Sequence, residues 1–264
     1  MVISKKICVV IAAGVLLLGC QAVKVEPIGG DKIGMVLMHA KGDNTKRVDS
    51  LASSLRSAGV LVATPLMPWS RNRIYDRTYD DSMLEIDAAV KRLKSKGARR
   101  IVVGGDSMGA NAALGYAARR EGLAGVVLLA YGHVPSGSFF SEKLRAYVGQ
   151  AKTMIDAGNG NKIGSFGDIN QSGTSTRFLR ADIYYSWFAP NGPASDKINA
   201  ANVKEGTPVL WVSGDADRVS KFGRRLIWYR IPDHPKNKFV VISSNHLNTL
   251  SNSIKTVADW LRTL

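Results

Sequence analysis

Six short apolar runs constrain the fold of this chain more than any other feature. They are IGMVLMH (33–39), VLVATP (60–65), IVVGG (101–105), LAGVVLLAYG (123–132), TPVLWVSG (207–214) and KFVVISS (238–244). Runs of this length are typical of strands that are covered on both faces. Segments with helical spacing, such as the one carrying Ile86, Val90 and Leu93, alternate with them. The pattern predicts an α/β fold, a mostly parallel sheet of about six strands with helices on both faces.

One long interval departs from this alternation. Residues 134–203 are rich in Gly, Ser and Asn around a helical segment, SEKLRAYVGQAKTMIDA. A stretch of this length between two buried strands is typical of a lid or of a flexible excursion. We therefore expect one domain over 32–264 that carries a lid insertion at about 134–203.

The first twenty residues form a unit of their own. A basic start, MVISKK, precedes ICVVIAAGVLLL, which is shorter than the ~20 residues needed to span a bilayer. This combination predicts a secretory signal peptide at 1–19 and a tether at 20–31. The ending LLGC resembles the bacterial lipobox, in which cleavage before the cysteine leaves its thiol lipidated. The resemblance implies a lipidated Cys20 and a membrane-anchored protein of the cell envelope, and Gln21 favours the periplasmic side of the outer membrane. An ordinary signal peptide with a chance cysteine is the alternative.

Cysteine content and charge exclude several functions. Cys8 and Cys20 are the two cysteines, so a mature domain would contain neither a catalytic thiol nor cysteine-bound zinc. The formal charge is +15, of which Lys5 and Lys6 carry two. A basic balance suggests nucleic acid, but the cations are dispersed and no aromatic-interleaved basic motif occurs. We expect no nucleic-acid partner. Anionic lipid, lipopolysaccharide or simply solvent would face the basic surface.

A single serine between two glycines follows the third apolar run, in Gly105-Asp106-Ser107-Met108-Gly109. The G-x-S-x-G pattern between a strand and an Ala-rich helix matches a nucleophile elbow. The glycines are needed because neighbouring backbone approaches too closely for a Cβ, and the helix start offers N–H groups to a developing oxyanion. A phosphate loop is excluded, because Ala110 and Asn111 stand where Lys and Ser/Thr are required. A purely structural glycine turn is the remaining alternative.

A serine nucleophile needs a base and an acid that orients it. Of the four histidines, His246 follows the last apolar run, so it should lie on the same rim as Ser107. Asp217 comes just after the fifth run, and Asp215 is the second candidate for the acid. His234, between two prolines, is interpreted as a surface residue.

Together these motifs resemble the α/β-hydrolase superfamily over about 33–264. The resemblance implies a triad in the chain order Ser107, Asp217, His246. The segment VLMHAKG resembles the H-G-x loop of that family, which implies an oxyanion hole made by the backbone N–H groups of Met108 and of Lys41 or Ala40. Ala40 stands where glycine is common. The compact core is similar to small esterases and dienelactone-hydrolase-like members.

The resemblance implies a serine hydrolase that cleaves a carboxylic ester or related acyl bond and uses neither a cofactor nor a metal. Two alternatives stay open, namely an amidase, thioesterase or peptidase with the same triad, and a non-catalytic envelope lipoprotein that uses the fold as a binding module. We expect a small-molecule or lipid-like acyl substrate. His39, His133 and Trp187 are candidates for lining its pocket, although each has an alternative structural role. The acyl group and the oligomeric state do not follow from the sequence.

Overall fold

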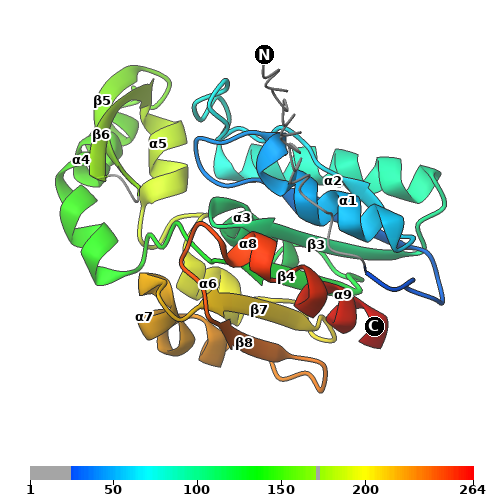
Figure 1. Ribbon diagram of the computed structural model, residues 1–264. Coiled ribbons are helices and arrows are strands. Elements are labelled where there is room, and N and C mark those ends of the chain that lie inside the picture. Colours follow the sequence, from blue (N-terminus) through cyan, green and yellow to red (C-terminus); the bar gives the residue numbers. More distant parts are fainter. Residues whose placement is uncertain (1–24, 171–172) are drawn as a thin grey trace, which may run out of the picture.

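A computed structural model describes residues 25–170 and 173–264, and the predicted signal peptide and Cys20 lie outside these residues. Its centre is a six-stranded, entirely parallel sheet in the order β2-β1-β3-β4-β7-β8 (Figure 1). The six strands are β1 (Ile33–Met38), β2 (Leu61–Ala63), β3 (Arg100–Asp106), β4 (Gly125–Leu129), β7 (Val209–Gly214) and β8 (Lys238–Ile242). The predicted fold class and sheet are confirmed.

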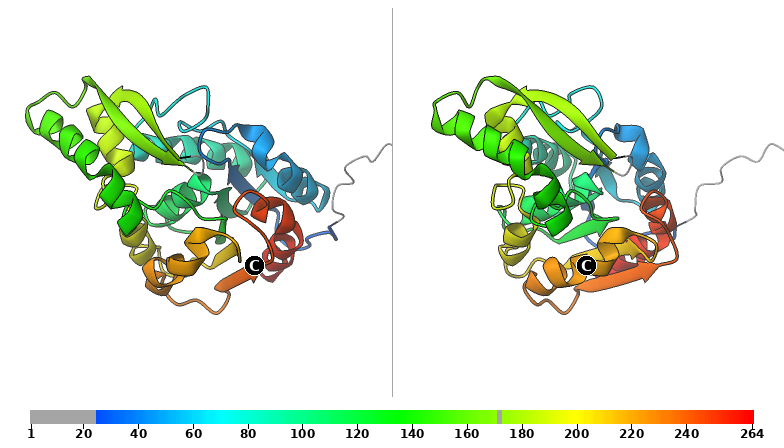
Figure 2. Two further views of the ribbon diagram at one scale, coloured as in Figure 1. Left: turned by 60° about the vertical axis from the view of Figure 1, so that its left-hand side comes forward. Right: turned by 90° about the vertical axis from the view of Figure 1, so that its left-hand side faces the viewer.

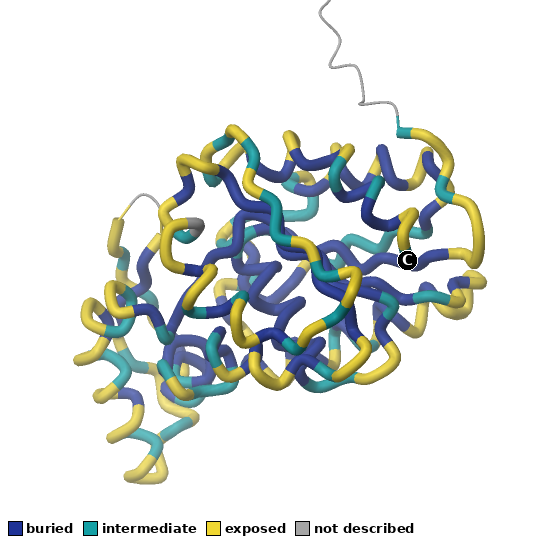
Figure 3. Tube along the Cα trace, turned by 90° about the horizontal axis from the view of Figure 1, so that it is seen from below, coloured by how far each residue is buried: buried dark blue, intermediate teal, exposed yellow. Residues whose placement is uncertain are grey.

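Helices cover both faces of the sheet because successive strand residues point to opposite sides. In β4, Val127 and Leu129 belong to one apolar cluster, whereas Val126 and Leu128 belong to the other. The first cluster contains α1 (Asp49–Ser57), α8 (Thr249–Asn252) and α9 (Ile254–Thr263); the second contains α2 (Tyr79–Ser95) and α3 (Met108–Ala117). Figure 3 shows the buried trace running through the middle of the molecule, with exposed segments around it.

Side chains define where the first helices begin. The helix α2 begins at Tyr79, within the polar stretch 68–81. The Thr78 side chain accepts from the backbone N–H of Asp81, and Asp81 returns a bond to the Thr78 backbone, which forms a capping box. After Asn44, whose side chain accepts from the Lys46 N–H, the chain forms a short 3₁₀ turn, η1 (Thr45–Val48), which leads into α1.

The segment between β4 and β7, which we call the insertion (134–203), has regular structure of its own. It contains α4 (Ser138–Asp156), the antiparallel hairpin β5 (Ile163–Asn170) and β6 (Gly173–Arg180), α5 (Ala181–Phe188) and α6 (Asp196–Ala201). Figures 1 and 2 show α4, α5 and the hairpin together at one end of the sheet. This is the end at which the strands finish, so the insertion lies beside the expected site.

The connection between β7 and β8 is formed by α7 (Arg218–Leu226) and η2 (Trp228–Arg230). Among the helices of residues 25–170 and 173–264, none has the length and apolar character needed to cross a bilayer.

Candidate active site

Ser107 stands at a sharp turn between β3 and α3, with φ +55° and ψ −108°. A non-glycine residue in this region is strained by on the order of 1–3 kcal/mol. The turn closes because positions 105 and 109 lack side chains. A Cβ on Gly105 would overlap the Gly109 backbone, and a Cβ on Gly109 would lie 2.5 Å from the Met38 carbonyl oxygen. These close approaches hold the start of α3 against the loop that follows β1.

The structure brings the three predicted triad residues together in one chain of hydrogen bonds. His246 Nδ1 lies 2.7 Å from Asp217 Oδ2, and His246 Nε2 lies 3.1 Å from Ser107 Oγ. A carboxylate is an acceptor only, so Nδ1 carries the proton and Nε2 presents its lone pair to the serine hydroxyl. The three residues come from the ends of β3, β7 and β8. Because the sheet is parallel, all three ends lie on one rim.

Asp217, the carboxylate that contacts His246, is held in place by the loop after β7. Asp217 is 1% exposed, and its Oδ1 accepts from the backbone N–H of Val219, which caps α7. Asp215 is exposed and instead accepts from the Ser244 N–H at 3.0 Å, tying the β7 loop to the histidine loop. The structure therefore places Asp217, and not Asp215, against His246.

Met108 directly follows Ser107, and Ala40 and Lys41 lie in the loop after β1. None of these three backbone N–H groups donates a hydrogen bond to a residue that the structure describes. Met108 is the first residue of α3, where N–H groups lack intrahelical partners and the helix dipole is positive. The next N–H along the β1 loop, that of Gly42, instead donates to Trp69 O at 2.9 Å. The Met108 N–H is thus available to a ligand, and both Ala40 and Lys41 remain candidates for a second donor.

His39 holds the loop that carries Lys41. It is fully buried, its Nδ1 lies 2.8 Å from Ala40 O, and its Nε2 accepts from the Met67 N–H at 3.1 Å. Burial, opposed by the hydrogen bond to Ala40, lowers the pKa of His39 and keeps the ring neutral. Trp69 Nε1 donates to the His39 carbonyl at 2.8 Å. These contacts tie the loop down and leave no ring atom of His39 exposed to a substrate.

His133 and Trp187 lie in an aromatic cluster between the rim and the insertion. His133 is 7% exposed and has φ +56°, and its Nε2 donates to Trp187 O at 2.7 Å. Its Nδ1 is buried without a partner among the described residues. Burial, and then the nearby Lys41 ammonium, lowers the pKa of His133 to about 3, so the ring is neutral. Trp187 is completely buried, and Phe188 packs edge-on against His133.

The side chain of Lys41 links the β1 loop to the insertion. Its ammonium lies 2.7 Å from Asp168 Oδ1 and 2.9 Å from Ile169 O, both in β5, and above the rings of Phe140 and Phe188. Asp168 is 1% exposed. Burial raises the pKa of its carboxyl, but the Lys41 ammonium and, to a smaller extent, Arg177 lower it, and the net change is downward. Lys41 thus connects the loop after β1 to the insertion.

Sequence reasoning missed Gly132, which follows β4 and has its Cα opposite the nucleophile. A Cβ there would overlap Ser107 Oγ and lie 3.4 Å from His246 Cε1. It also missed the Lys41–Asp168 pair, whose members are 127 positions apart. For Gly132 the available signal was a glycine that follows a buried strand. For the Lys41–Asp168 pair the sequence contained no signal.

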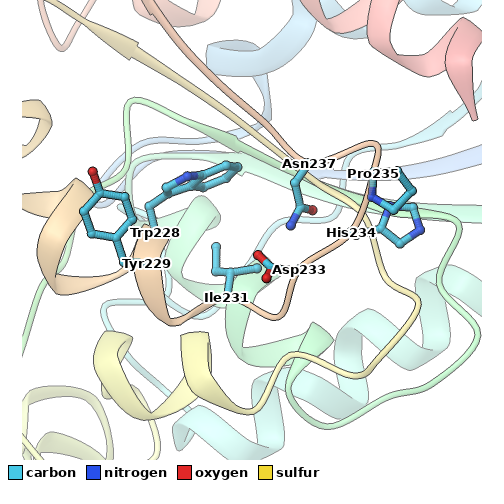
Figure 4. Close-up of a pocket in the computed structure, with 7 residues that line it drawn as sticks. All are labelled: Trp228, Tyr229, Ile231, Asp233, His234, Pro235 and Asn237. Carbon is cyan, nitrogen blue, oxygen red and sulfur yellow. The ribbon is translucent and has the colours of Figure 1, made fainter.

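Two surface cavities lie away from the triad. One, of about 480 Å³, is lined by residues of η2 and the turn after it, including Trp228, Asp233 and His234 (Figure 4). The other, of about 390 Å³, lies between α2 and the end of α3. Neither is lined by Ser107 or His246. Within the described part of the chain, no group of three His, Cys, Asp or Glu side chains is placed to hold a metal ion.

Comparison with known proteins places the fold. No family model matches the sequence, and no curated protein matches it. Solved structures do match in shape. One described with two metagenome-derived lipolytic enzymes, LipS and LipT, has a TM-score of 0.63 and 17% identity, over 92% of this chain and 99% of that one. A monoacylglycerol lipase of Paleococcus ferrophilus has a TM-score of 0.60 and 18% identity, over 91% and 96%.

A thermostable carboxyl esterase from Bacillus coagulans has a TM-score of 0.62 and 14% identity, over 90% of each chain. At such identities the likeness establishes the fold alone. The sheet order, the covering helices and these neighbours together show that the chain has the α/β-hydrolase fold. A fold does not define a reaction, so the function has to be argued from the site.

Proposed function

We propose that this chain is a serine hydrolase that cleaves a carboxylic ester or a related acyl bond through an acyl-enzyme. The observation that carries the proposal is the continuous chain of hydrogen bonds from Asp217 through His246 to Ser107, and the unpaired N–H of Met108, the next residue, supports it. A structural serine needs neither an oriented base nor unpaired donors. The lipolytic and esterase neighbours support the same reaction class.

The reaction follows from this arrangement. Ser107 Oγ attacks the acyl carbon while His246 Nε2 takes its proton, and Asp217 stabilises the imidazolium that forms. The carbonyl oxygen becomes an oxyanion between the N–H groups of Met108 and Lys41, each donor contributing about 3 kcal/mol in the transition state. The tetrahedral intermediate collapses, the bond from carbon to the leaving oxygen breaks, and His246 gives its proton to that oxygen. Water then enters by the same route and releases the acid.

In this proposal substrate selection falls to the insertion. Trp187 is completely buried and His133 nearly so, and therefore they support the acyl site from behind, while His39 acts through the loop it holds. A thioester is the second candidate substrate, since a thioesterase domain from the curacin pathway matches the fold with a TM-score of 0.56 and 14% identity over 87% of this chain and 91% of that domain. The same triad serves either bond.

We also propose that the enzyme is anchored in the cell envelope through a lipidated Cys20, on the periplasmic side of the outer membrane. The basic start, the apolar stretch and the LLGC ending support this proposal. Cys20→Ser should abolish incorporation of an alkyne-tagged fatty acid and release the protein from the membrane fraction. Unchanged incorporation would overturn the anchor and leave the catalytic proposal untouched.

The catalytic proposal is tested with a panel of p-nitrophenyl esters of increasing acyl length, together with matched thioesters. The wild-type protein should turn over at least the short-chain esters, and Ser107→Ala should lose this turnover while keeping its melting temperature. Ser251→Ala, at an exposed serine of α8, is the matched control and should be fully active. Wild-type protein that is inert throughout would favour the binding-module alternative.

A further inference from the structure

Arg47 contacts two of the three segments that carry the proposed triad. It lies in η1, just after the loop that carries Lys41. Its Nε donates to Asp106 Oδ2 at 2.6 Å, and its Nη2 donates to Leu247 O at 2.8 Å. Asp106 directly precedes the nucleophile Ser107, and Leu247 directly follows the base His246. One guanidinium therefore joins the elbow and the histidine loop from a third segment.

The elbow end of this link is a buried charge. Asp106 is completely buried at the end of β3, and its Oδ1 has no hydrogen-bond partner among the described residues. Arg47 is the cation that pairs with it, and 21% of the Arg47 side chain is exposed. A buried carboxylate needs such a partner, because burying it alone is costly. The aspartate thus gives the guanidinium a fixed position directly beneath the nucleophile.

The other end of the link is the loop that carries His246. Leu247 is 60% exposed, so its side chain packs little and does not hold the loop. Before His246, the loop is tied to the β7 loop through Ser244, whose N–H donates to Asp215 and whose carbonyl accepts from Ala216. After it, Asn245 closes a turn around His246 and Leu247, because its carbonyl accepts from the N–H of Thr249, which is buried, and its side chain accepts from the N–H of Asn248. The bond from Arg47 to the Leu247 carbonyl joins this turn to the elbow.

We propose that Arg47 is a positioning residue of the hydrolase: it fixes the histidine loop relative to the elbow and so holds His246 Nε2 within hydrogen-bond distance of Ser107 Oγ. The inference rests on the proposed function. Asp106 is its anchor and touches neither the substrate nor the reacting atoms. A guanidinium is required because its planar fork reaches both acceptors at once, whereas a lysine ammonium at the end of a flexible stem does not present two donors in that geometry.

The test separates positioning from stability. In Arg47→Ala, kcat for a short-chain ester should fall about 100-fold, as misplacement by about 1 Å commonly costs, while KM changes little. Added guanidinium ion should restore part of kcat by filling the same site. The double variant Arg47→Met/Asp106→Asn removes the buried charge together with its partner, so it should fold and melt near the wild type yet keep the low kcat. Arg120→Ala, which breaks a pair with Asp87 remote from the rim, is the matched control and should keep full activity.

The outcomes are distinct. A double variant with wild-type kcat and wild-type fluorophosphonate labelling would overturn the inference, as would a fall in activity that follows melting temperature alone and is not rescued by guanidinium. If Arg47→Ala does not fold, the double variant decides. Wild-type protein that neither hydrolyses esters nor reacts with the probe would instead fail the proposed function, and this inference with it.

Discussion

Replacing Gly132 with alanine should cripple the proposed nucleophile without unfolding the protein. The Gly132 N–H donates to Ser107 O at 3.2 Å, which holds the glycine directly opposite the elbow. The new methyl group would overlap Ser107 Oγ, because the two atoms would be closer than 3.0 Å, a separation that real Cβ atoms essentially never show. Ordinary van der Waals contact begins at 3.4 Å. The hydroxyl must therefore move by about 1 Å, out of its 3.1 Å bond to His246 Nε2.

We expect this displacement to lower kcat about 100-fold, equivalent to about 2.7 kcal/mol in the transition state. Stability should fall by only about 1 kcal/mol, the low end for overpacking, because the serine side chain can rotate away. The assay is steady-state hydrolysis of a short-chain ester together with the rate of fluorophosphonate labelling.

Gly149→Ala is the matched control, because nothing lies within 4 Å of its Cβ position inside α4. It should raise the free energy of unfolding by roughly 0.5–1 kcal/mol and leave kcat unchanged. Wild-type kcat in Gly132→Ala would refute the geometry described for the nucleophile.

Three further predictions concern the acid, the buried histidine and the link to the insertion. Asp217→Asn should lower kcat by about 10⁴, whereas Asp215→Asn should cost little; the reverse order in ester assays would contradict the assignment of Asp217 as the acid. His133 is neutral when folded, with its pKa lowered from 6.5 to about 3, so its stabilisation is complete above pH 6.5 and about 2 kcal/mol of it is lost by pH 5. His133→Asn, which tolerates the positive φ, should therefore lose less stability between pH 7 and 5 in urea titrations; an unchanged pH dependence would argue against this. Lys41→Met removes the nearest cation from the buried Asp168 and leaves Arg177 at 3.4 Å as its remaining ion-pair partner among the described residues, so it should destabilise the protein by about 3 kcal/mol and speed proteolysis of the insertion. Adding Asp168→Asn should restore most of the loss, and no restoration would count against a buried ion pair.

The sheet could be predicted from the sequence because each strand carries its own signal. A run such as VVLL in β4 is apolar at every position, since alternate residues enter different cores. The elbow was predictable because its two glycines lie four residues apart around the serine. Gly105 is needed by the Gly109 backbone, which is a local contact, whereas Gly109 is needed by the Met38 carbonyl at the end of the neighbouring strand β1.

The hairpin of the insertion left no such pattern. β5 contains Gly164, Gly167 and Asn170, which are all unfavourable in strands. Its position is set by long-range packing instead, with Phe166 stacked on Tyr184 at 4.3 Å. The sequence therefore predicted an insertion and the helical segment that forms α4, but not the hairpin.

Among site residues, the triad was predictable from its order along the chain, whereas the side-chain partners were not. Lys41 was predicted through its backbone, and its side chain contacts β5, more than a hundred residues later. Arg47 is one cation among 36 in the sequence. Only the folded chain shows that it lies between Asp106 and Leu247. A residue that acts through partners far away in the sequence has no characteristic sequence spacing by which it could be predicted.

The most direct test of the proposed nucleophile is the site of covalent modification by a fluorophosphonate probe, located by peptide mass spectrometry on the wild-type protein. We predict a single adduct on Ser107, formed at a rate that falls sharply in His246→Ala and disappears in Ser107→Ala. An adduct on another serine, or a wild-type protein that stays unmodified while remaining folded, would contradict the claim that Ser107 is an activated nucleophile.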